Sequence, residues 1–166
     1  MKKVLYFISI IALFSSCAKD GKDGATGPAG NANVKAFEFN VTPGDWLTSG
    51  TAGNPDHAKY VELNVPALTP AIMESGLVLT YIDLSGYYVQ LPTILPVNQT
   101  AYINFVTAYT EGIVEVDLQL SNLQTPNTNS ANYTFKVIIA DGVARLTHPE
   151  VNWKDLHQVE EVFNLD

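Results

Sequence analysis

The segment Ile113-Val-Glu-Val-Asp-Leu-Gln-Leu120 decides the fold class of this chain. Its apolar residues alternate strictly with polar residues, among them Glu115 and Asp117. Because successive side chains of a β-strand point to opposite faces of a sheet, this period of two predicts a strand with one buried and one wet face. Such alternation is typical of antiparallel sheets. Glu111-Gly112 precedes the segment and indicates a tight turn from a strand over 102–109.

Further short apolar runs, separated by turn residues, extend this pattern along the chain. We expect strands over 34–41, 60–65, 77–82, 87–91 and 133–139, and one helical turn over 71–75. In the run 87–91, we expect Tyr87 to point into the core and Tyr88 to point away from it. About seven to eight strands at this spacing predict an antiparallel β-sandwich of Ig-like or jelly-roll type. Asp141-Gly142 indicates a turn that ends the last strand.

The last residues change to a helical period. Four apolar residues recur there at spacings of three or four: Trp153, Leu156, Val159 and Phe163. This spacing predicts a helix over 153–164 that packs across the sandwich or its end. We expect Asn152 as its N-cap and Asp155 as the acid of a capping box. The predicted domain, a β-sandwich with a C-terminal helix, covers residues 34–166.

Composition and charge exclude several classes of protein. The chain has 166 residues, of which 46% are hydrophobic, and a formal net charge of −8. This apolar fraction argues against wholesale disorder. The negative charge argues against nucleic-acid binding, which requires Lys and Arg against phosphates. A single cysteine excludes an intramolecular disulfide and a multi-cysteine zinc site.

The first 17 residues indicate an export signal. Two lysines precede an apolar run over 4–14, and small residues then lead to Cys17. This run is shorter than the roughly 20 apolar residues that cross a bilayer. The pattern predicts a signal peptide over 1–16 that is cleaved before Cys17. The alternatives are a buried N-terminal helix of the fold and a secreted protein in which Cys17 is a free thiol.

Phe14-Ser15-Ser16-Cys17 resembles the lipobox of bacterial lipoproteins, except that Leu is commoner than Phe at the first position. The resemblance implies that Cys17 carries acyl chains, such as palmitate, which anchor the mature chain to a membrane. Cleavage there leaves 7 basic and 17 acidic residues, a net charge of −10. Ala18-Lys19-Asp20 resembles the tag of Bacteroidetes surface lipoproteins. It implies the outer membrane with the domain facing the exterior, and the periplasmic face is the alternative.

Residues 17–33 join the predicted anchor to the domain. Glycine recurs there at every third position: Gly21, Gly24, Gly27 and Gly30. A Gly-X-Y period of this kind allows a collagen triple helix, but four triplets are few. We expect an extended spacer on a monomer, and the alternative is a trimer seeded by the folded domain.

This Gly-X-Y stretch, together with Val65-Pro66-Ala67-Leu68-Thr69 and Gly76-Leu77-Val78-Leu79-Thr80-Tyr81, is similar to uncharacterised collagen-like lipoproteins of Bacteroidetes. Leu91-Pro92, residues 135–139, Ala144-Arg145 and the terminal segment continue the similarity in order. Ala140-Asp141-Gly142 departs from it, since a Pro-Gly turn is expected there. The resemblance implies location and architecture, and it transfers no catalytic residue and no cofactor.

Residues suited to chemistry are few. Glu115 and Asp117 share one strand face at about 7 Å, and a hydrolase would need such a pair inside a cleft. We expect them on the solvent face instead. Asp56-His57 could contribute to a metal site, with a solvated loop pair as the alternative, but the three or four ligands that zinc requires do not converge in the sequence. The sequence therefore predicts a non-catalytic protein without cofactor or metal.

Two aromatic residues are the remaining candidates for ligand binding. Tyr88, pointing outward, and Trp46, in a loop, would form a platform for sugar rings if both were exposed. The alternative for Trp46 is that it folds back and plugs the end of the core. The leading interpretation is a lipid-anchored binding or structural module whose partners are the membrane and a glycan or surface protein. A carbohydrate-binding accessory protein in glycan capture is the first alternative, and a hydrolase using Glu115 and Asp117 is the second.

Overall fold

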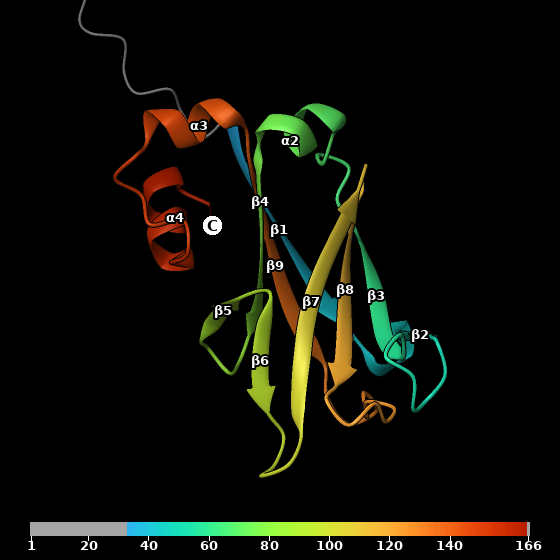
Figure 1. Cartoon of the computed structure of the whole chain (residues 1–166). Helices are drawn as coiled ribbons and strands as arrows, with labels where there is room; N and C mark the ends of the chain where they lie inside the picture. The colour runs from blue at the N-terminus through green and yellow to red at the C-terminus, as the bar shows by residue number, and fades with distance from the viewer. Residues whose placement is uncertain (1–32, 166) are drawn as a thin grey trace, which may run out of the picture.

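The computed structural model describes residues 33–165, which form a β-sandwich of two antiparallel sheets (Figure 1). The four-stranded sheet contains, in order, β1 (Val34–Val41), β9 (Tyr133–Ala140), β4 (Leu77–Asp83) and β5 (Tyr88–Gln90). The five-stranded sheet contains, in order, β2 (Leu47–Ser49), β3 (Ala58–Asn64), β8 (Ile113–Leu120), β7 (Tyr102–Thr110) and β6 (Thr93–Pro96). The predicted fold class is confirmed, with nine strands in the described part rather than seven to eight. The predicted signal peptide, Cys17 and the Gly-X-Y segment lie outside the described residues.

The β7–β8 hairpin forms as predicted. Thr110 pairs with Ile113 across the turn, and Gly112 adopts a φ of 76°, which glycine reaches without a steric cost. On β8, the residues Val114, Val116 and Leu118 are buried. The alternation in the sequence therefore corresponds to one face turned toward the opposite sheet.

Within the described residues, three short α-helices accompany the sandwich: α2 (Pro70–Ser75), α3 (Gly142–Thr147) and α4 (Leu156–Phe163). The helical turn predicted at 71–75 corresponds to α2. The turn predicted at Asp141-Gly142 is wrong, because the Asp141 carboxylate accepts a hydrogen bond from the Ala144 backbone N–H at 2.9 Å and caps α3. Aspartate is favoured both at the N-cap of a helix and in a turn, so the local sequence does not distinguish the two structures.

The terminal helix is shorter than predicted. Asp155, rather than Asn152, is its N-cap and accepts a hydrogen bond from the Gln158 backbone N–H. The Asn152 side chain instead accepts a hydrogen bond from the backbone N–H of Lys154, two residues later. Trp153 therefore precedes the helix, although its ring still packs 5.3 Å from that of Phe163.

Two hydrophobic cores lie on opposite faces of the four-stranded sheet. The main core fills the space between the sheets, and β9 contributes Phe135, Val137 and Ile139 to it. A second core lies between this sheet and the C-terminal segment, and β9 contributes Ile138 and Ala140 to it. Figure 1 shows α3 and α4 on this side of the sheet. The four-stranded sheet is thus covered on both faces.

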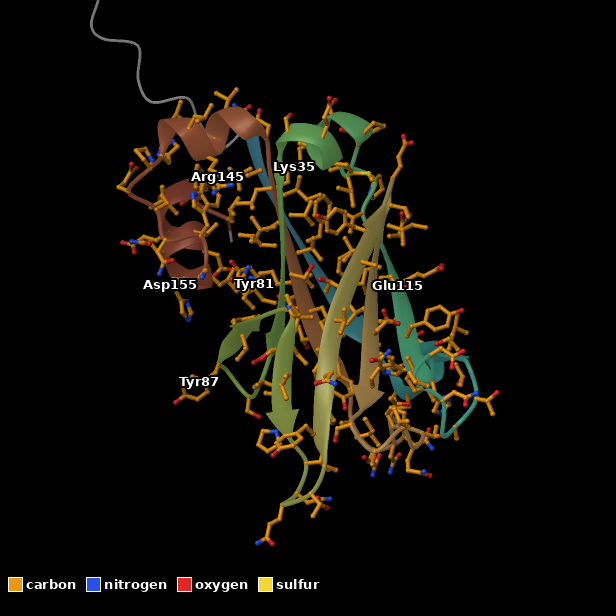
Figure 2. All side chains as sticks on the ribbon, viewed as in Figure 1. Lys35, Tyr81, Tyr87, Glu115, Arg145 and Asp155 are labelled. Carbon is orange, nitrogen blue, oxygen red and sulfur yellow. The ribbon has the colours of Figure 1, made fainter. Side chains whose placement is uncertain are left out.

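The prediction for Tyr87, next to β5, is wrong. Tyr87, expected in the core, is 77% exposed, and Figure 2 shows it pointing away from the protein. It lies in the turn before β5, where Ser85 and Gly86 have positive φ angles. Tyr88 points away from the main core as predicted, but it packs against the second core.

Candidate functional site

Trp46 is part of the main core. A 3-10 turn, Pro43–Asp45, directs its side chain inward, where only 6% of the residue is exposed. Its ring lies 5.5 Å from that of Tyr133 and 6.4 Å from that of Phe135. The prediction that Trp46 forms an exposed sugar platform is therefore wrong, and the alternative, that it plugs the core, is confirmed.

Tyr88 is likewise not a free platform. Its ring is partly buried against the second core, and the Lys136 ammonium lies 5.4 Å from the ring centroid. Burial raises the pKa of the Tyr88 hydroxyl, although the charge of Lys136 acts in the opposite direction. Tyr88 is therefore not the fully exposed platform that was expected, and ligand binding at Tyr88 stays a prediction.

Lys136 joins the four-stranded sheet to α4. From β9, its ammonium contacts the Glu160 carboxylate on α4 and lies 3.9 Å from the Glu38 carboxylate on β1. Burial alone would lower the pKa of Lys136, but the hydrogen bond and charge of Glu160 more than offset this and raise it. Because the Lys136 ammonium has its carboxylate partners within the protein, these contacts indicate a structural role for Lys136.

The outer face of the five-stranded sheet is the candidate binding site, and we call it the open face. Strand register places its outward side chains in rows. The first row crosses four strands and contains Leu47, Tyr60, Asp117 and Val106. Beside it lie two rows, one with Glu62, Glu115 and Ala108 and the other with Gln119, Asn104 and Ile94. In Figure 1, the strands β7 and β8 carry no helix over this face.

Three carboxylates gather near the centre of the open face. Glu62 stands directly opposite Glu115 in the ladder, and Asp117 follows Glu115 on the same side of β8. Partial burial, with the charges of Asp117 and Glu62, raises the pKa of Glu115, and burial also raises the pKa of Asp117. None of the three forms a hydrogen bond or salt bridge with another described residue. Their oxygens are free to accept hydrogen bonds from a ligand.

The geometry of Glu115 and Asp117 gives the hydrolase alternative no support. Both side chains lie on an open sheet, whereas paired catalytic carboxylates act inside a cleft that holds the substrate. A depression of about 420 Å³ lies between β1 and β3, and its lining includes Glu62 and Leu47 but neither Glu115 nor Asp117. The open face is suited to binding by contact rather than to enclosing a substrate.

His57 is a buried structural residue rather than part of a solvated pair. It is 4% exposed, and its Nδ1 lies 3.0 Å from the Ser49 carbonyl oxygen. Since a carbonyl only accepts hydrogen bonds, Nδ1 carries the proton. Its Nε2 lies 2.9 Å from the Thr125 hydroxyl. Within residues 33–165, no three His, Cys, Asp or Glu side chains are grouped so that they could hold a metal ion.

A second surface feature lies at the end of the sandwich where α2 and α3 meet. A depression of about 920 Å³ opens there, lined by residues that include Ser75, Val143, Arg145, Leu146 and Trp153. This depression was not predictable from the sequence pattern, because Asp141-Gly142 indicated a turn rather than the start of α3.

The described part of the chain has no helix long and apolar enough to cross a membrane. Comparison of the whole chain with family models, curated proteins and solved structures gives no match. The similarity to collagen-like lipoproteins therefore stays a prediction from sequence.

Proposed function

We propose that this protein is a lipid-anchored, non-catalytic binding module that the outer membrane displays on its outward face. The observation that carries the proposal is the asymmetry of the sandwich. One sheet is covered on both faces, whereas the open face presents Tyr60, Asp117 and Glu115 without partners in the described protein. Like charges on neighbouring strands repel and do not stabilise a sheet. We therefore assign this face to ligand contact.

Anchoring through Cys17 is supported by the apolar run over 4–14 and the small residues before the cysteine. Metabolic labelling with an alkyne analogue of palmitate tests it. We expect label on the wild-type chain and on Ser15→Ala, which keeps a small residue there, and no label on Cys17→Ala. An unlabelled wild-type chain would refute the anchor.

The outward orientation has its own test. Protease added to intact cells should degrade the domain when it faces the exterior. The same treatment after the outer membrane is permeabilised gives the reference for complete digestion. Protection in intact cells, with digestion after permeabilisation, would place the domain on the periplasmic face instead.

Carbohydrate binding remains the second candidate, but at different residues. Trp46 is buried and Tyr88 packs against the second core, whereas Tyr60, which is also partly buried, lies beside Asp117 on the open face, with Gln119 in the next row. An aromatic ring beside carboxylate and amide groups can stack on a sugar and bind its hydroxyls. A glycan array tests this candidate with Tyr60→Ala, and the exposed Tyr87 supplies a matched Tyr→Ala control away from the open face.

We expect retention of a neutral glycan by the wild type and by Tyr87→Ala, and its loss in Tyr60→Ala. A uronic-acid glycan should bind less well, because the three carboxylates repel its charge. Absence of binding to every glycan would end the carbohydrate candidate, and it would leave the anchor untouched.

A further inference from the structure

We propose that the end of the sandwich formed by α2 and α3 rests on the surface of the lipid bilayer that carries the anchor. This inference rests on the proposed acylation of Cys17. We define the α2–α3 end by its three exposed apolar side chains, Met73 on α2 and Val143 and Leu146 on α3. Leu146 is 81% exposed and Val143 is 56% exposed, so these groups have no cover within the described protein.

The two helices form one continuous surface. A Cβ added to Gly142, the first residue of α3, would lie 2.6 Å from the Ser75 carbonyl oxygen at the end of α2. A Cβ added to Gly76 would lie 2.7 Å from the Ala140 carbonyl oxygen. Glycine at both positions therefore permits the close approach, which brings the exposed side chains of α2 and α3 to the same end (Figure 1).

The N-terminal segment enters the domain at this same end. The backbone carbonyl of Asn33 accepts a hydrogen bond from the Asp141 N–H at 3.0 Å, beside the start of α3. The next residue, Val34, pairs with Ala140. An acyl group on Cys17 is thus connected to the α2–α3 end rather than to the opposite end of the strands.

The length of this connection allows contact with the bilayer. Sixteen residues, 17–32, precede Asn33. A chain of sixteen residues spans at most roughly 55 Å, so the α2–α3 end stays within that distance of the acyl group. The tether keeps the α2–α3 end at high local concentration near the lipid, so a small apolar patch is sufficient for contact.

The charges of the α2–α3 end favour an electrically neutral bilayer. Figure 2 shows Lys35 and Arg145 toward this end, and Glu74 and Glu150 lie in or next to its helices, so charges of both signs are present. The 920 Å³ depression combines Arg145 and Trp153 with apolar walls, a combination suited to the headgroup region. Because the mature chain carries a net charge of −10, an anionic surface would repel it.

The test uses the acylated chain in phosphatidylcholine vesicles and a nitrobenzoxadiazole dye on an introduced cysteine. Acylation consumes the thiol of Cys17, so Leu146→Cys and the matched Ile94→Cys each provide a single labelling site. Ile94 is also exposed and lies on the open face, away from α3. We expect blue-shifted emission and quenching by nitroxide lipids with the dye at position 146, and neither effect at position 94. Adding Val143→Asp should abolish the quenching at 146.

Each other outcome has a definite meaning. Vesicles that float with the chain attached, but with equal and weak quenching at both positions, would overturn the inference and keep the anchor. A chain that does not float with vesicles would refute the proposed anchor itself. Blue-shifted emission at 146 without lipid quenching would show that a second copy covers the α2–α3 end, and it would overturn the bilayer contact.

Discussion

The hydroxyl of Tyr81 donates a hydrogen bond to the backbone carbonyl oxygen of Trp153 at 2.8 Å, across 72 residues of sequence. Tyr81 is fully buried in β4, and Trp153 lies just before α4. Burial raises the pKa of Tyr81 far above its usual value, and the charges of Asp155 and Glu160 raise it further. The hydroxyl therefore stays protonated and acts as a permanent donor between the sheet and the C-terminal segment.

Replacing Tyr81 by Phe should destabilise the domain by about 1–3 kcal/mol, because the partly buried carbonyl of Trp153 loses its donor. Chemical denaturation followed by circular dichroism measures this change. The matched control is Tyr60→Phe, since the hydroxyl of Tyr60 has no hydrogen-bond partner in the described residues. Equal stability of the two variants would contradict a structural role for the Tyr81 hydroxyl.

Removing the ammonium of Lys136 should also loosen α4. In Lys136→Met, the Glu160 carboxylate, whose side chain is only 20% exposed, loses its hydrogen bond to the ammonium and keeps only the His157 ring, 3.9 Å away. We expect a loss of about 1.5–3 kcal/mol in the free energy of unfolding, as for a hydrogen bond to a charged group. Lys59→Met removes an exposed contact to Thr48 and should cost much less. A similar cost for both variants would argue against the role assigned to Lys136.

The pH dependence of this contribution has a definite sign. Because the pKa of Lys136 is raised in the folded state, its stabilisation is fully present below the unfolded pKa of about 10.4. It is lost as the pH rises through the folded pKa. Alkaline unfolding of the wild type and of Lys136→Met should therefore converge at high pH. Parallel curves throughout that range would contradict the assignment.

The core position of Trp46 predicts very different effects for two substitutions. Trp46→Ala should cost about 3–5 kcal/mol through the cavity that it leaves. Trp46→Phe should cost less, because the indole Nε1 is buried without a hydrogen-bond partner in the described residues and its removal relieves an unpaired donor. Urea denaturation midpoints compare the two. An equal loss in the two variants would contradict this account.

Neutralising Glu115 should stabilise the domain at neutral pH. Its raised pKa means that the folded state disfavours the ionised form, so the folded state gains stability as the pH falls through that pKa. Glu115→Gln should be more stable than the wild type at pH 7 by about 0.2–1 kcal/mol, the range for cross-strand pairs. The difference should vanish near pH 4. Thermal unfolding checks this, with the turn variant Glu111→Gln as the control.

His57 should behave as a link between loops and not as a metal ligand. His57→Ala removes contacts to the Ser49 carbonyl and the Thr125 hydroxyl, and we expect a loss of about 2–4 kcal/mol. His157→Ala is the matched control, because its side chain is 79% exposed. Added zinc should leave the unfolding temperature of the wild type unchanged. A zinc-dependent rise that His57→Ala abolishes would contradict this account.

The parts of the fold that follow from local sequence were predictable. In β8, one face is buried and the other is wet, so apolar and polar residues alternate strictly in the sequence. The predicted strand has the observed bounds, Ile113–Leu120. In β9, Ile138 and Ala140 break the alternation because a second core covers the outer face. The strand was recognised, but its two-sided burial requires knowledge of where α4 packs.

The errors arise where distant contacts or one turn residue decide the structure. The burial of His57 depends on Thr125, 68 residues away. Tyr87 was placed in the core wrongly because the turn at Gly86 extends one residue further than expected, so Tyr87 precedes β5, whereas Tyr88 and Val89 lie on the predicted faces. The open face depends on register, since Glu62 and Glu115 are adjacent only once β3 and β8 pair.

The pairing of β1 with β9 has a consequence for biosynthesis. Val34 cannot pair with Ala140 until the ribosome has made residue 140. At typical translation rates this takes about 5–20 s after Val34 is made. During that time β9 is incomplete, so neither β1 nor β4 has its full neighbouring strand and the four-stranded sheet cannot form. An export channel that accepts only unfolded chains would therefore receive this chain before β1 could pair with β9.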